Sequence, residues 1–297
     1  MGAHVTILIP FCFFNFFFSV LCSMSLFIAS LNSGSNGNCY YVGNESEAVL
    51  VDAGISCREI EKRMASLELP VNRVKAIFIS HEHIDHIRGV DVLAKKYNLP
   101  IYMTPVMQKS IPVRLPKNLV CSFQSNKPVA IGALKVTAFA KQHDAVDPYS
   151  FIVEGNGVKI GVITDIGIAC DQVIHYFKQC HAAFLESNYD EHMLEHGGYP
   201  IHLKRRIRGG KGHLSNVQAL QLFINHRPAF MSHLLLAHLS KNNNHPELVH
   251  DLFIKHANKT NIVVASRYGE TPVYHIVDAA HRKDVVPFKP LQLSLFE

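Results

Sequence analysis

The amino-acid sequence predicts an α/β fold in which two β-sheets pack against each other and carry helices on their outer faces. Short apolar or β-branched runs come first, and strands then alternate with helical segments twice along the chain. Of the 297 residues, 48% are hydrophobic and 18% are charged, which permits a sizeable core and excludes a globally disordered chain.

Ten segments have the composition of strands: 26–31, 39–42, 48–51, 76–80, 134–139, 151–153, 159–164, 182–185, 234–237 and 262–264. Helical spacing of apolar residues predicts five helices, at 57–67, 89–97, 171–178, 216–226 and 246–257. No low-complexity linker interrupts residues 24–278, which we interpret as one domain. Pro287 and Pro290 predict that residues 279–297 form an extended, mobile tail.

Residues 1–23 differ in composition from the rest of the chain. They contain no Lys, Arg, Asp or Glu, and six of the 18 Phe lie at positions 11–18. A signal peptide needs a positively charged start, and a membrane helix needs about 20 apolar residues without interruptions such as Pro10 and Asn15. We interpret this extension as an upstream mis-start with Met24 as the initiator; an export or anchor signal and a structured segment are the alternatives.

The amino-acid composition limits the kinds of functional site that the chain can contain. The net charge of +5 permits a polyanionic partner without demanding one. Seven Cys without any C-x-x-C pair exclude a disulfide framework and a thiolate zinc site, and they fit a reducing compartment. The 19 His nearly equal the 24 acidic residues in number, which predicts metal or proton chemistry where they cluster.

The densest cluster directly follows an apolar strand and contains His81, His83, Asp85 and His86. Side chains two positions apart in an extended backbone face the same side, so His81 and His83 can reach one ion. Asp85 and His86 lie one turn further on and can serve a second ion beside the first.

Three further residues each end or follow an apolar strand: His143, Asp165 and His238. Together with the first cluster they form a set of seven nitrogen and oxygen ligands without a thiolate. Imidazole and carboxylate ligands suit Zn²⁺, Mn²⁺ or Fe²⁺, and two such ions can share a bridging carboxylate. We expect two divalent transition-metal ions, Zn²⁺ or Mn²⁺.

The order of these motifs along the chain resembles that of the metallo-β-lactamase fold superfamily. The resemblance implies an αββα sandwich with a binuclear metal site at one edge of the two sheets. It further implies that His81, His83 and His143 bind one ion, that Asp85, His86 and His238 bind the other, and that Asp165 bridges them. The β-lactamases themselves have a Cys ligand where this chain has Asp165, which favours phosphoesterase chemistry.

Finer features resemble the YycJ (WalJ) group of DNA exonucleases. They are Gly34-Ser35-Asn36-Gly37-Asn38, Glu186-Ser187-Asn188-Tyr189-Asp190, Lys204-Arg205-Arg206-Ile207, Gly212-His213-Leu214-Ser215-Asn216 and His238-Leu239-Ser240. Ribonuclease Z and the cyclic phosphodiesterase of phosphonate breakdown share the layout more loosely. In these relatives a His before the last metal ligand aids catalysis, and His213 holds that place here.

Phosphodiester hydrolysis requires a proton for the departing oxygen. His213 is the candidate acid, and Asp85 beside the second ion is the competing assignment. Lys204, Arg205 and Arg206 precede His213 and predict a cradle for the phosphate backbone. Ser35 and Asn36, in a short polar turn, are candidate hydrogen-bond donors to a terminal phosphate. The sequence has no Trp and no run of aromatic residues, so it does not indicate a preference for single strands.

We therefore expect a two-metal phosphodiesterase that acts on DNA, a 5′→3′ exonuclease linked to mismatch repair or replication. An RNA or cyclic-phosphate phosphodiesterase of the same fold is the alternative. A thioester hydrolase is a more distant one, because the basic segment favours a polymeric substrate. A non-catalytic adaptor is disfavoured by the complete ligand set.

The C-terminal residues Gln292-Leu293-Ser294-Leu295-Phe296-Glu297 resemble the peptide with which bacterial DNA polymerases and repair proteins bind the sliding clamp. Leu293, Leu295 and Phe296 would fill an apolar pocket, and the Gln292 amide would form hydrogen bonds beside it. This resemblance implies the sliding clamp as a partner and a cytoplasmic enzyme, if Met24 is the true start, without stable membrane association.

Overall fold

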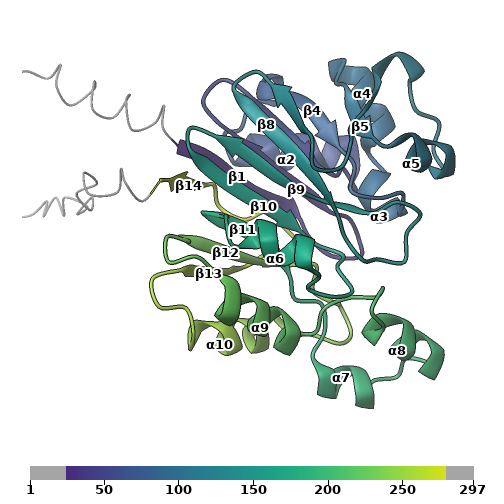
Figure 1. Ribbon diagram of the computed structural model, residues 1–297. Coiled ribbons are helices and arrows are strands. Elements are labelled where there is room, and N and C mark those ends of the chain that lie inside the picture. The colour runs from purple at the N-terminus through teal and green to yellow at the C-terminus, as the bar shows by residue number, and fades with distance from the viewer. Residues whose placement is uncertain (1–24, 279–297) are drawn as a thin grey trace, which may run out of the picture.

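The computed structural model describes residues 25–278 and contains two seven-stranded sheets (Figure 1). The first has the order β14-β1-β2-β3-β4-β5-β6, with β1 (Ser25–Asn32), β2 (Cys39–Gly43), β3 (Ala48–Val51), β4 (Val74–Phe78), β5 (Ile101–Met103), β6 (Val120–Ser122) and β14 (Tyr274–Val277). The second has the order β13-β12-β11-β10-β9-β8-β7, with β7 (Pro128–Ile131), β8 (Leu134–Ala140), β9 (Tyr149–Gly155), β10 (Val158–Ile163), β11 (Ala182–Glu186), β12 (His233–Ala237) and β13 (Asn261–Val264).

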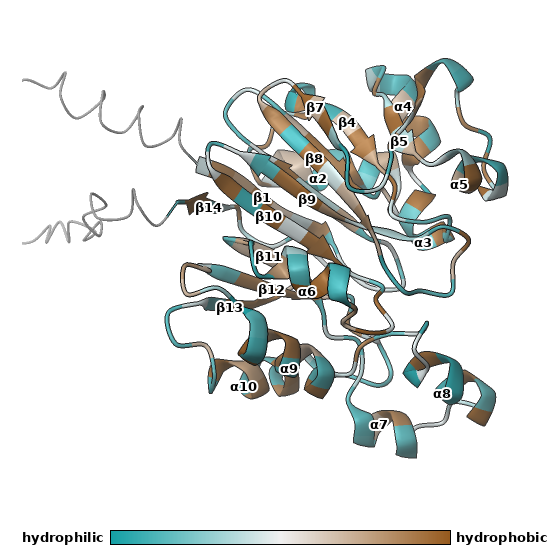
Figure 2. Ribbon diagram, in the orientation of Figure 1, coloured by the Kyte–Doolittle hydropathy of each residue, from teal (hydrophilic) through white to brown (hydrophobic). Residues whose placement is uncertain are grey.

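One apolar core lies between the two sheets. Leu26 and Phe78 of the first sheet and Phe151 and Phe184 of the second belong to this cluster, and all four side chains are buried. In β8 the inward-facing residues are buried and alternate with more exposed ones, as a half-buried strand requires. The hydropathy colouring shows long brown stretches along the strands, and it shows helices that carry both brown and teal residues (Figure 2).

Two further apolar clusters join the outer faces of the sheets to helices. The first sheet packs against α2 (Cys57–Ser66), α4 (Val90–Tyr97) and α5 (Pro105–Ser110). The second packs against α6 (Asp171–Phe177), α9 (Asn216–His226) and α10 (Pro246–Ile254). This arrangement confirms the predicted αββα sandwich.

All ten predicted strands and all five predicted helices are present, with small shifts at their ends. The sequence prediction omitted the strands β5, β6, β7 and β14 and the helices α3 (Ile84–Ile87), α5, α7 (Glu191–His196) and α8 (Ile201–Arg208). It also omitted two short 3₁₀ turns, at Val71–Arg73 and Lys117–Leu119. These elements have three to eight residues, too few for a periodic pattern to stand out.

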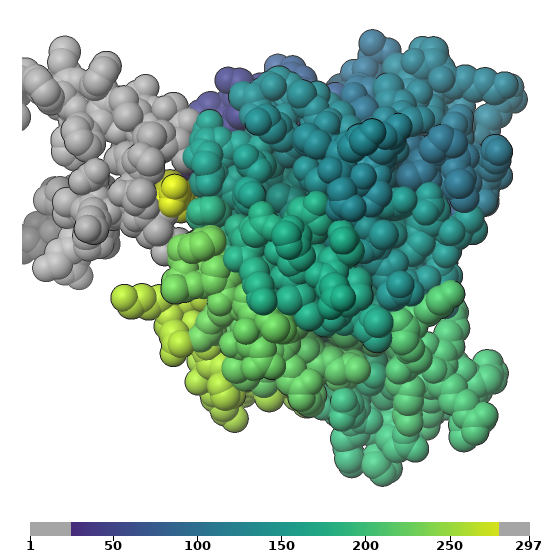
Figure 3. Space-filling view, viewed as in Figure 1, coloured from purple at the N-terminus to yellow at the C-terminus, as the bar shows by residue number. Residues whose placement is uncertain are grey.

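Helices α7 and α8 form an excursion that projects from the sandwich (Figures 1 and 3). Its two ends meet where the Asn188 N–H donates to the Leu214 carbonyl at 3.0 Å and the Asn216 N–H donates to the Tyr189 carbonyl at 2.8 Å. A capping box between Ser215 and Gln218 then starts α9. No residue of α8 is buried, and in α7 the buried residue Leu194 belongs to none of the three apolar clusters, so the excursion adds little to the core.

Parallel pairing determines where the functional residues gather. Strands β3 to β6 run parallel to one another, as do β10 to β13. Their carboxyl ends therefore meet at one edge of each sheet, and the residues at or just after these ends are Asp52, His81, Asp165, Glu186 and His238.

Within residues 25–278, no helix has the length and apolar character needed to cross a membrane. The predicted N-terminal extension and the predicted tail with its clamp-binding peptide lie outside the described residues.

Candidate metal centre

The seven predicted metal ligands lie together in the structure, in adjoining groups that share members. His81, His83 and His143 form one group, and the other groups are His81/His86/Asp165, Asp85/His86/His238 and Asp165/Glu186/His213/His238. Within each group the potential ligand atoms all lie within 4.8 Å of one another. Asp165 belongs to two groups, and its Oδ2 lies 3.4 Å from Nε2 of His86 while its Oδ1 lies 3.3 Å from Nδ1 of His238.

Hydrogen bonds from the Nδ1 atoms orient the rings on the His86 side of the site. Asp52 is fully buried, and its Oδ2 accepts from Nδ1 of His86 at 2.7 Å and from the Ser80 hydroxyl at 2.8 Å. Because that hydroxyl donates to Asp52, Nδ1 of His81 donates to the Ser80 oxygen at 2.9 Å. In His81 and His86 the Nε2 atom therefore carries the lone pair that a metal ion requires.

Hydrogen bonds from Nδ1 also orient the histidine rings on the other side of the site. Nδ1 of His143 donates to the Gly212 carbonyl at 3.1 Å, and Nδ1 of His238 donates to Oε1 of Glu186 at 3.0 Å. Four of the five histidines predicted as ligands thus have an outer partner that fixes the ring and its tautomer, an arrangement typical of metal-binding histidines.

Three of the residues in this cluster have left-handed backbone conformations. The φ angles are 62° for Asp52, 53° for Asp165 and 58° for His238, each just beyond a strand end. This conformation is uncommon for residues other than glycine and costs roughly 1–3 kcal/mol, so it persists only where surrounding contacts hold it. Here it turns three side chains from their strands into one shared site.

The turn after β1 supports the second group of ligands. Asn38 is buried, and its Nδ2 lies 3.4 Å from Oδ2 of Asp85 and 3.1 Å from Nε2 of His86. The backbone of Asp85 packs against Gly54, where a β-carbon would lie 1.6 Å from the Asp85 carbonyl oxygen. Only glycine therefore permits this approach. Ser35 and Asn36 of the same turn are exposed, as a contact with substrate requires.

The charges around the site are those of a metal-binding centre. Burial lowers the pKa of His81 well below its ordinary value and the pKa of His143 to about 4, which keeps both rings neutral. Burial also lowers the pKa of His86 and of His238. For His86 the nearby carboxylates of Asp52 and Asp165 outweigh this effect. For His238 the carboxylates of Asp165, Asp85 and Glu186 do so. The pKa of both rings is therefore raised.

Buried nitrogen and oxygen atoms that lack a hydrogen-bond partner provide a direct test of whether metal ions fit the site. Nε2 of His143, Nε2 of His238 and Oδ2 of Asp165 are buried without a hydrogen-bond partner among the described residues. Nε2 of His81 faces Nδ1 of His83 at 3.0 Å. Buried polar atoms without partners are rare and costly, and a cation between converging lone pairs satisfies them. The donor set therefore fits divalent ions such as Zn²⁺ or Mn²⁺.

His213, the predicted acid, lies at the rim of this cluster with a fifth of its side chain exposed. Its Nδ1 donates to Oε1 of Glu186 at 2.8 Å, which leaves Nε2 as the ring nitrogen free to act on a substrate. Burial raises the pKa of Glu186, but His213 and His238 outweigh it and hold that pKa at about 2. Glu186 is therefore ionised and accepts the hydrogen bond from Nδ1 of His213 as a carboxylate.

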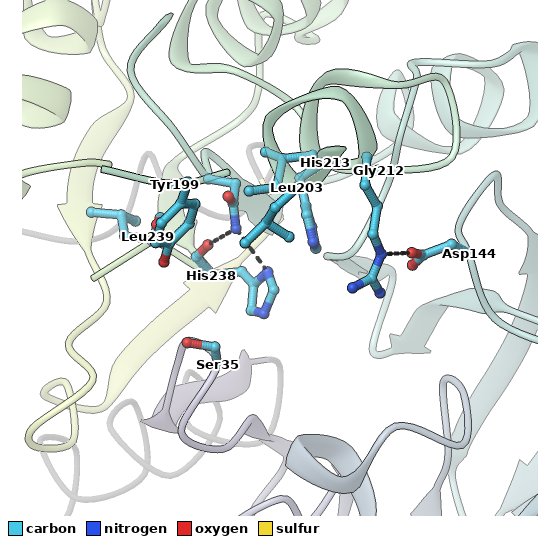
Figure 4. A pocket seen from close by; sticks show the side chains of 12 residues that line it. Ser35, Asp144, Tyr199, Leu203, Gly212, His213, His238 and Leu239 are labelled. Atoms are coloured by element: carbon cyan, nitrogen blue, oxygen red, sulfur yellow. Dashed lines mark hydrogen bonds and ion pairs between the residues drawn. The ribbon is translucent and has the colours of Figure 1, made fainter. Parts of the chain in front are cut away.

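A cavity of about 190 Å³ opens beside the cluster and contains His213 and His238 in its wall. In Figure 4 the ring of His238 lies between Ser35, from the turn after β1, and Leu203 of α8. Arg206 of α8 also lines the cavity and forms an ion pair with Asp144, next to the ligand His143.

The other two predicted phosphate contacts of α8 do not line this cavity. Lys204 donates to the Glu195 carbonyl, and Arg205 is exposed. Asn36 does not line it either, since its amide donates to the Arg267 carbonyl at 2.8 Å. Of the predicted phosphate contacts, Ser35 and Arg206 lie where a substrate in this cavity can reach them.

Sequence reasoning missed several residues of the site. Glu186 and Asn188 stood in the quoted motif but had no assigned role, and Asn188 Nδ2 donates to the His238 carbonyl at 2.7 Å. Lys141 is buried and donates to the Thr164 carbonyl at 2.8 Å, beside Asp165. Their position in the sequence could have indicated them, because these residues, like the predicted ligands, lie at or just beyond the ends of strands.

Residues 47–238 match the model of the beta-lactamase superfamily domain. The chain therefore belongs to the metallo-β-lactamase superfamily, and it is a metal-dependent hydrolase. The metallo-beta-lactamase fold protein YhfI from Bacillus subtilis shares the fold, with a TM-score of 0.63 at 19% identity over 84% of this chain and 99% of that one.

Two relatives place the chain more narrowly. It is 37% identical over 228 residues to Exodeoxyribonuclease YycJ of Bacillus anthracis, across 76% of this chain and 86% of that protein. It is 32% identical over 225 residues to Exodeoxyribonuclease WalJ of Streptococcus pneumoniae, across 74% of this chain and 84% of that protein. Within the superfamily, the chain is a member of the YycJ-like group.

Proposed function

We propose that this chain is a two-metal phosphodiesterase that cleaves DNA as an exonuclease. Its two named relatives are exodeoxyribonucleases, and it spans 86% and 84% of their lengths. The observation that carries the proposal is the cluster of seven nitrogen and oxygen ligands, five of them buried, which adjoins a cavity lined by an imidazole and a guanidinium.

A phosphodiester resists hydrolysis because its negative charge repels a nucleophile and because its alkoxide is a poor leaving group. Two divalent ions lower the pKa of a water molecule and neutralise charge on the phosphate. We assign one ion to His81, His83 and His143 and the other to Asp85, His86 and His238. Asp165 lies between the two groups and is assigned to both ions.

His213 is assigned to the proton transfer. Its Nδ1 is engaged by Glu186, so Nε2–H of the protonated ring is the donor to the departing oxygen. Burial raises the pKa of Asp85, but His86 and His238 outweigh it and the net shift is downward. Asp85 is therefore a carboxylate suited to metal binding, which favours His213 over Asp85 as the acid.

Arg206 and Ser35 are assigned to the phosphate groups of the substrate. Arg206 is tied to Asp144, with 60% of its side chain exposed beside the cavity. A guanidinium oriented by a carboxylate is well placed to bind a phosphate oxygen. Ser35 offers a hydroxyl from the opposite wall (Figure 4).

We further propose that the exonuclease proceeds 5′→3′, that it serves mismatch repair or replication in the cytoplasm, and that Gln292, Leu293, Leu295 and Phe296 bind the sliding clamp. The support is the sequence of the C-terminal peptide, which lies outside the described residues. Binding to a clamp that encircles DNA raises the local concentration of substrate.

The test is an assay of the purified full chain with Mn²⁺ on 5′-labelled duplex DNA, on RNA of the same sequence and on bis(p-nitrophenyl) phosphate. We expect DNA cleavage with early release of the labelled 5′ nucleotide. The Asp165→Ala variant, purified in parallel, controls for contaminating nucleases. Cleavage of RNA without cleavage of DNA would overturn the proposed substrate, and a ladder that shortens from the 3′ end would overturn the direction.

A further inference from the structure

A second cavity of about 440 Å³ adjoins the metal-site cavity. The two share Leu239 and Ser240, which directly follow the ligand His238, so the second cavity begins one residue from the metal centre. Its opposite wall is the segment after β13, with Arg267 and Tyr268. A volume of this size lies within the range of small-ligand pockets, roughly 300–1,000 Å³.

Arg267 lies at the junction of the two cavities. Its Nη2 donates to the hydroxyl of Ser35, a residue of the metal-site cavity, at 2.9 Å. Gly34 lies beneath it with a φ of 118°, and a β-carbon there would approach Nη2 to 3.4 Å. Among residues 25–278 no carboxylate forms an ion pair with Arg267, and its Nη1 is buried without a hydrogen-bond partner. The guanidinium therefore brings an uncompensated positive charge and one unsatisfied donor to this junction, and a phosphate would balance that charge.

Tyr268 is the most exposed large hydrophobic residue of the described chain, at 78%. Its backbone is nevertheless held, because its N–H donates to the Ser266 hydroxyl at 3.0 Å and the Ser33 N–H donates to the Ser266 carbonyl at 3.1 Å. Thr271, three residues on, is buried and exchanges hydrogen bonds with Ser30. The ring thus stands in solvent on a fixed backbone, which suits it to stack on a planar ligand.

Charge favours an anionic ligand in the second cavity. Lys241 and Arg267 line it, and Glu247 is the only carboxylate among its described lining residues. A nucleotide matches both kinds of residue in the cavity wall, because its phosphate can bind the cations and its base can stack on the tyrosine ring.

We propose that the second cavity binds the nucleotide next to the scissile phosphate at the cleaved end of DNA, with Arg267 on its phosphate and Tyr268 stacked on its base. This inference rests on the proposed nuclease function and adds a nucleotide subsite to it. The sequence did not indicate a stacking residue, because it lacks a run of aromatic residues.

The experiment compares the full chain with its Tyr268→Ala and Tyr268→Phe variants on a single-stranded oligodeoxynucleotide. Two further oligonucleotides carry an abasic residue, one at the first and one at the second position from the cleaved end. Each kcat/KM is normalised to the same variant's rate on bis(p-nitrophenyl) phosphate, which removes any general damage to the site.

We expect Tyr268→Ala to lower the normalised kcat/KM about 5- to 100-fold through KM, the range of base stacking, while Tyr268→Phe retains it. With one of the two abasic substrates the difference between Ala and Tyr should disappear. Arg267→Gln should reduce the salt dependence of binding by about one phosphate contact, and Arg58→Gln, an exposed cation on α2, should not.

The outcomes separate the two proposals. If the wild type cleaves DNA and Tyr268→Ala matches it on all three oligonucleotides, the nucleotide subsite is overturned and the nuclease function stands. If the wild type hydrolyses only the small diester, the nuclease function itself has failed.

Discussion

Oε1 of Glu186 lies 2.8 Å from Nδ1 of His213, and the same oxygen lies 3.0 Å from Nδ1 of His238. The carboxylate is fully buried and also accepts the Ile166 N–H at 2.7 Å through its other oxygen. One side chain therefore holds both the candidate acid and a candidate metal ligand in place, so in the proposed mechanism proton transfer would depend on the same contact as metal geometry.

The Glu186→Gln substitution preserves the shape of this contact and removes its charge. We expect both activity and metal affinity to fall about 10- to 100-fold, the scale of outer partners of metal ligands. Glu154→Gln, which removes an exposed carboxylate paired with Lys159, is the matched control. Unchanged kinetics and metal affinity in Glu186→Gln would contradict the coupling.

The His213→Ala variant should retain its metal ions and lose about 10²- to 10⁴-fold in rate on DNA, the scale of a proton-transfer group. The loss should shrink on bis(p-nitrophenyl) phosphate, because nitrophenolate departs without a proton. Rate measurements on both substrates check this expectation. Equal losses on the two substrates would mean that His213 binds substrate and does not transfer the proton.

The Asp165→Ala variant should have no turnover and a reduced metal content, because one carboxylate faces both ligand groups. Elemental analysis of the dialysed protein measures the number of ions per chain. Asp251→Ala, at a side chain that is 75% exposed, serves as the control and should have the wild-type content. Two ions per chain and normal activity in Asp165→Ala would refute the bridging role.

Metal binding should strengthen as the pH rises and should release protons. Burial lowers the pKa of His86 and of His238, but the carboxylates around them outweigh it and raise both. Both rings therefore retain protons to higher pH than an ordinary histidine, and an ion must displace those protons to bind. Calorimetric titration with Zn²⁺ or Mn²⁺ between about pH 6 and 8.5, in buffers of different ionisation enthalpy, measures both effects. A flat affinity without proton release would contradict this charge assignment.

Deletion of residues 292–297 should abolish binding to a purified bacterial sliding clamp and leave cleavage of free DNA intact. We expect an affinity in the micromolar range for the full chain, about −8 kcal/mol, as is typical of a short peptide with a few apolar anchors. Lys289→Ala, a change in the same tail outside the peptide, is the control. Equal clamp binding by the truncated and full chains would overturn the assignment.

The ligand cluster could be predicted from the sequence because His81, His83, Asp85 and His86 are local, and local spacing translates directly into geometry. Longer strands and amphipathic helices were predictable for a similar reason, since their periodicity extends over enough residues to be recognised. The three-residue strands β5 and β6 owe their pairing to neighbours distant in sequence, which no local pattern reveals.

Glu186 and Tyr268 mark the limit of sequence reasoning at the site. Glu186 begins the motif Glu186-Ser187-Asn188-Tyr189-Asp190, but the motif does not reveal its role, which depends on which histidines the fold brings to it. A single tyrosine in a loop likewise becomes informative only when its exposure and its position in the wall of the second cavity are known.

The excursion that carries α7 and α8 leaves and re-enters the sandwich at one point, where Asn188 and Asn216 pair with Leu214 and Tyr189. The spacing of its ends is thus independent of the length of chain between them, and lengthening such a segment costs little free energy. Exchanging this segment would replace Arg206 and His213 together, and also the Gly212 carbonyl that accepts from His143. All seven predicted metal ligands lie outside it. The excursion therefore carries the proposed substrate and proton-transfer contacts, whereas the sandwich carries the proposed metal contacts.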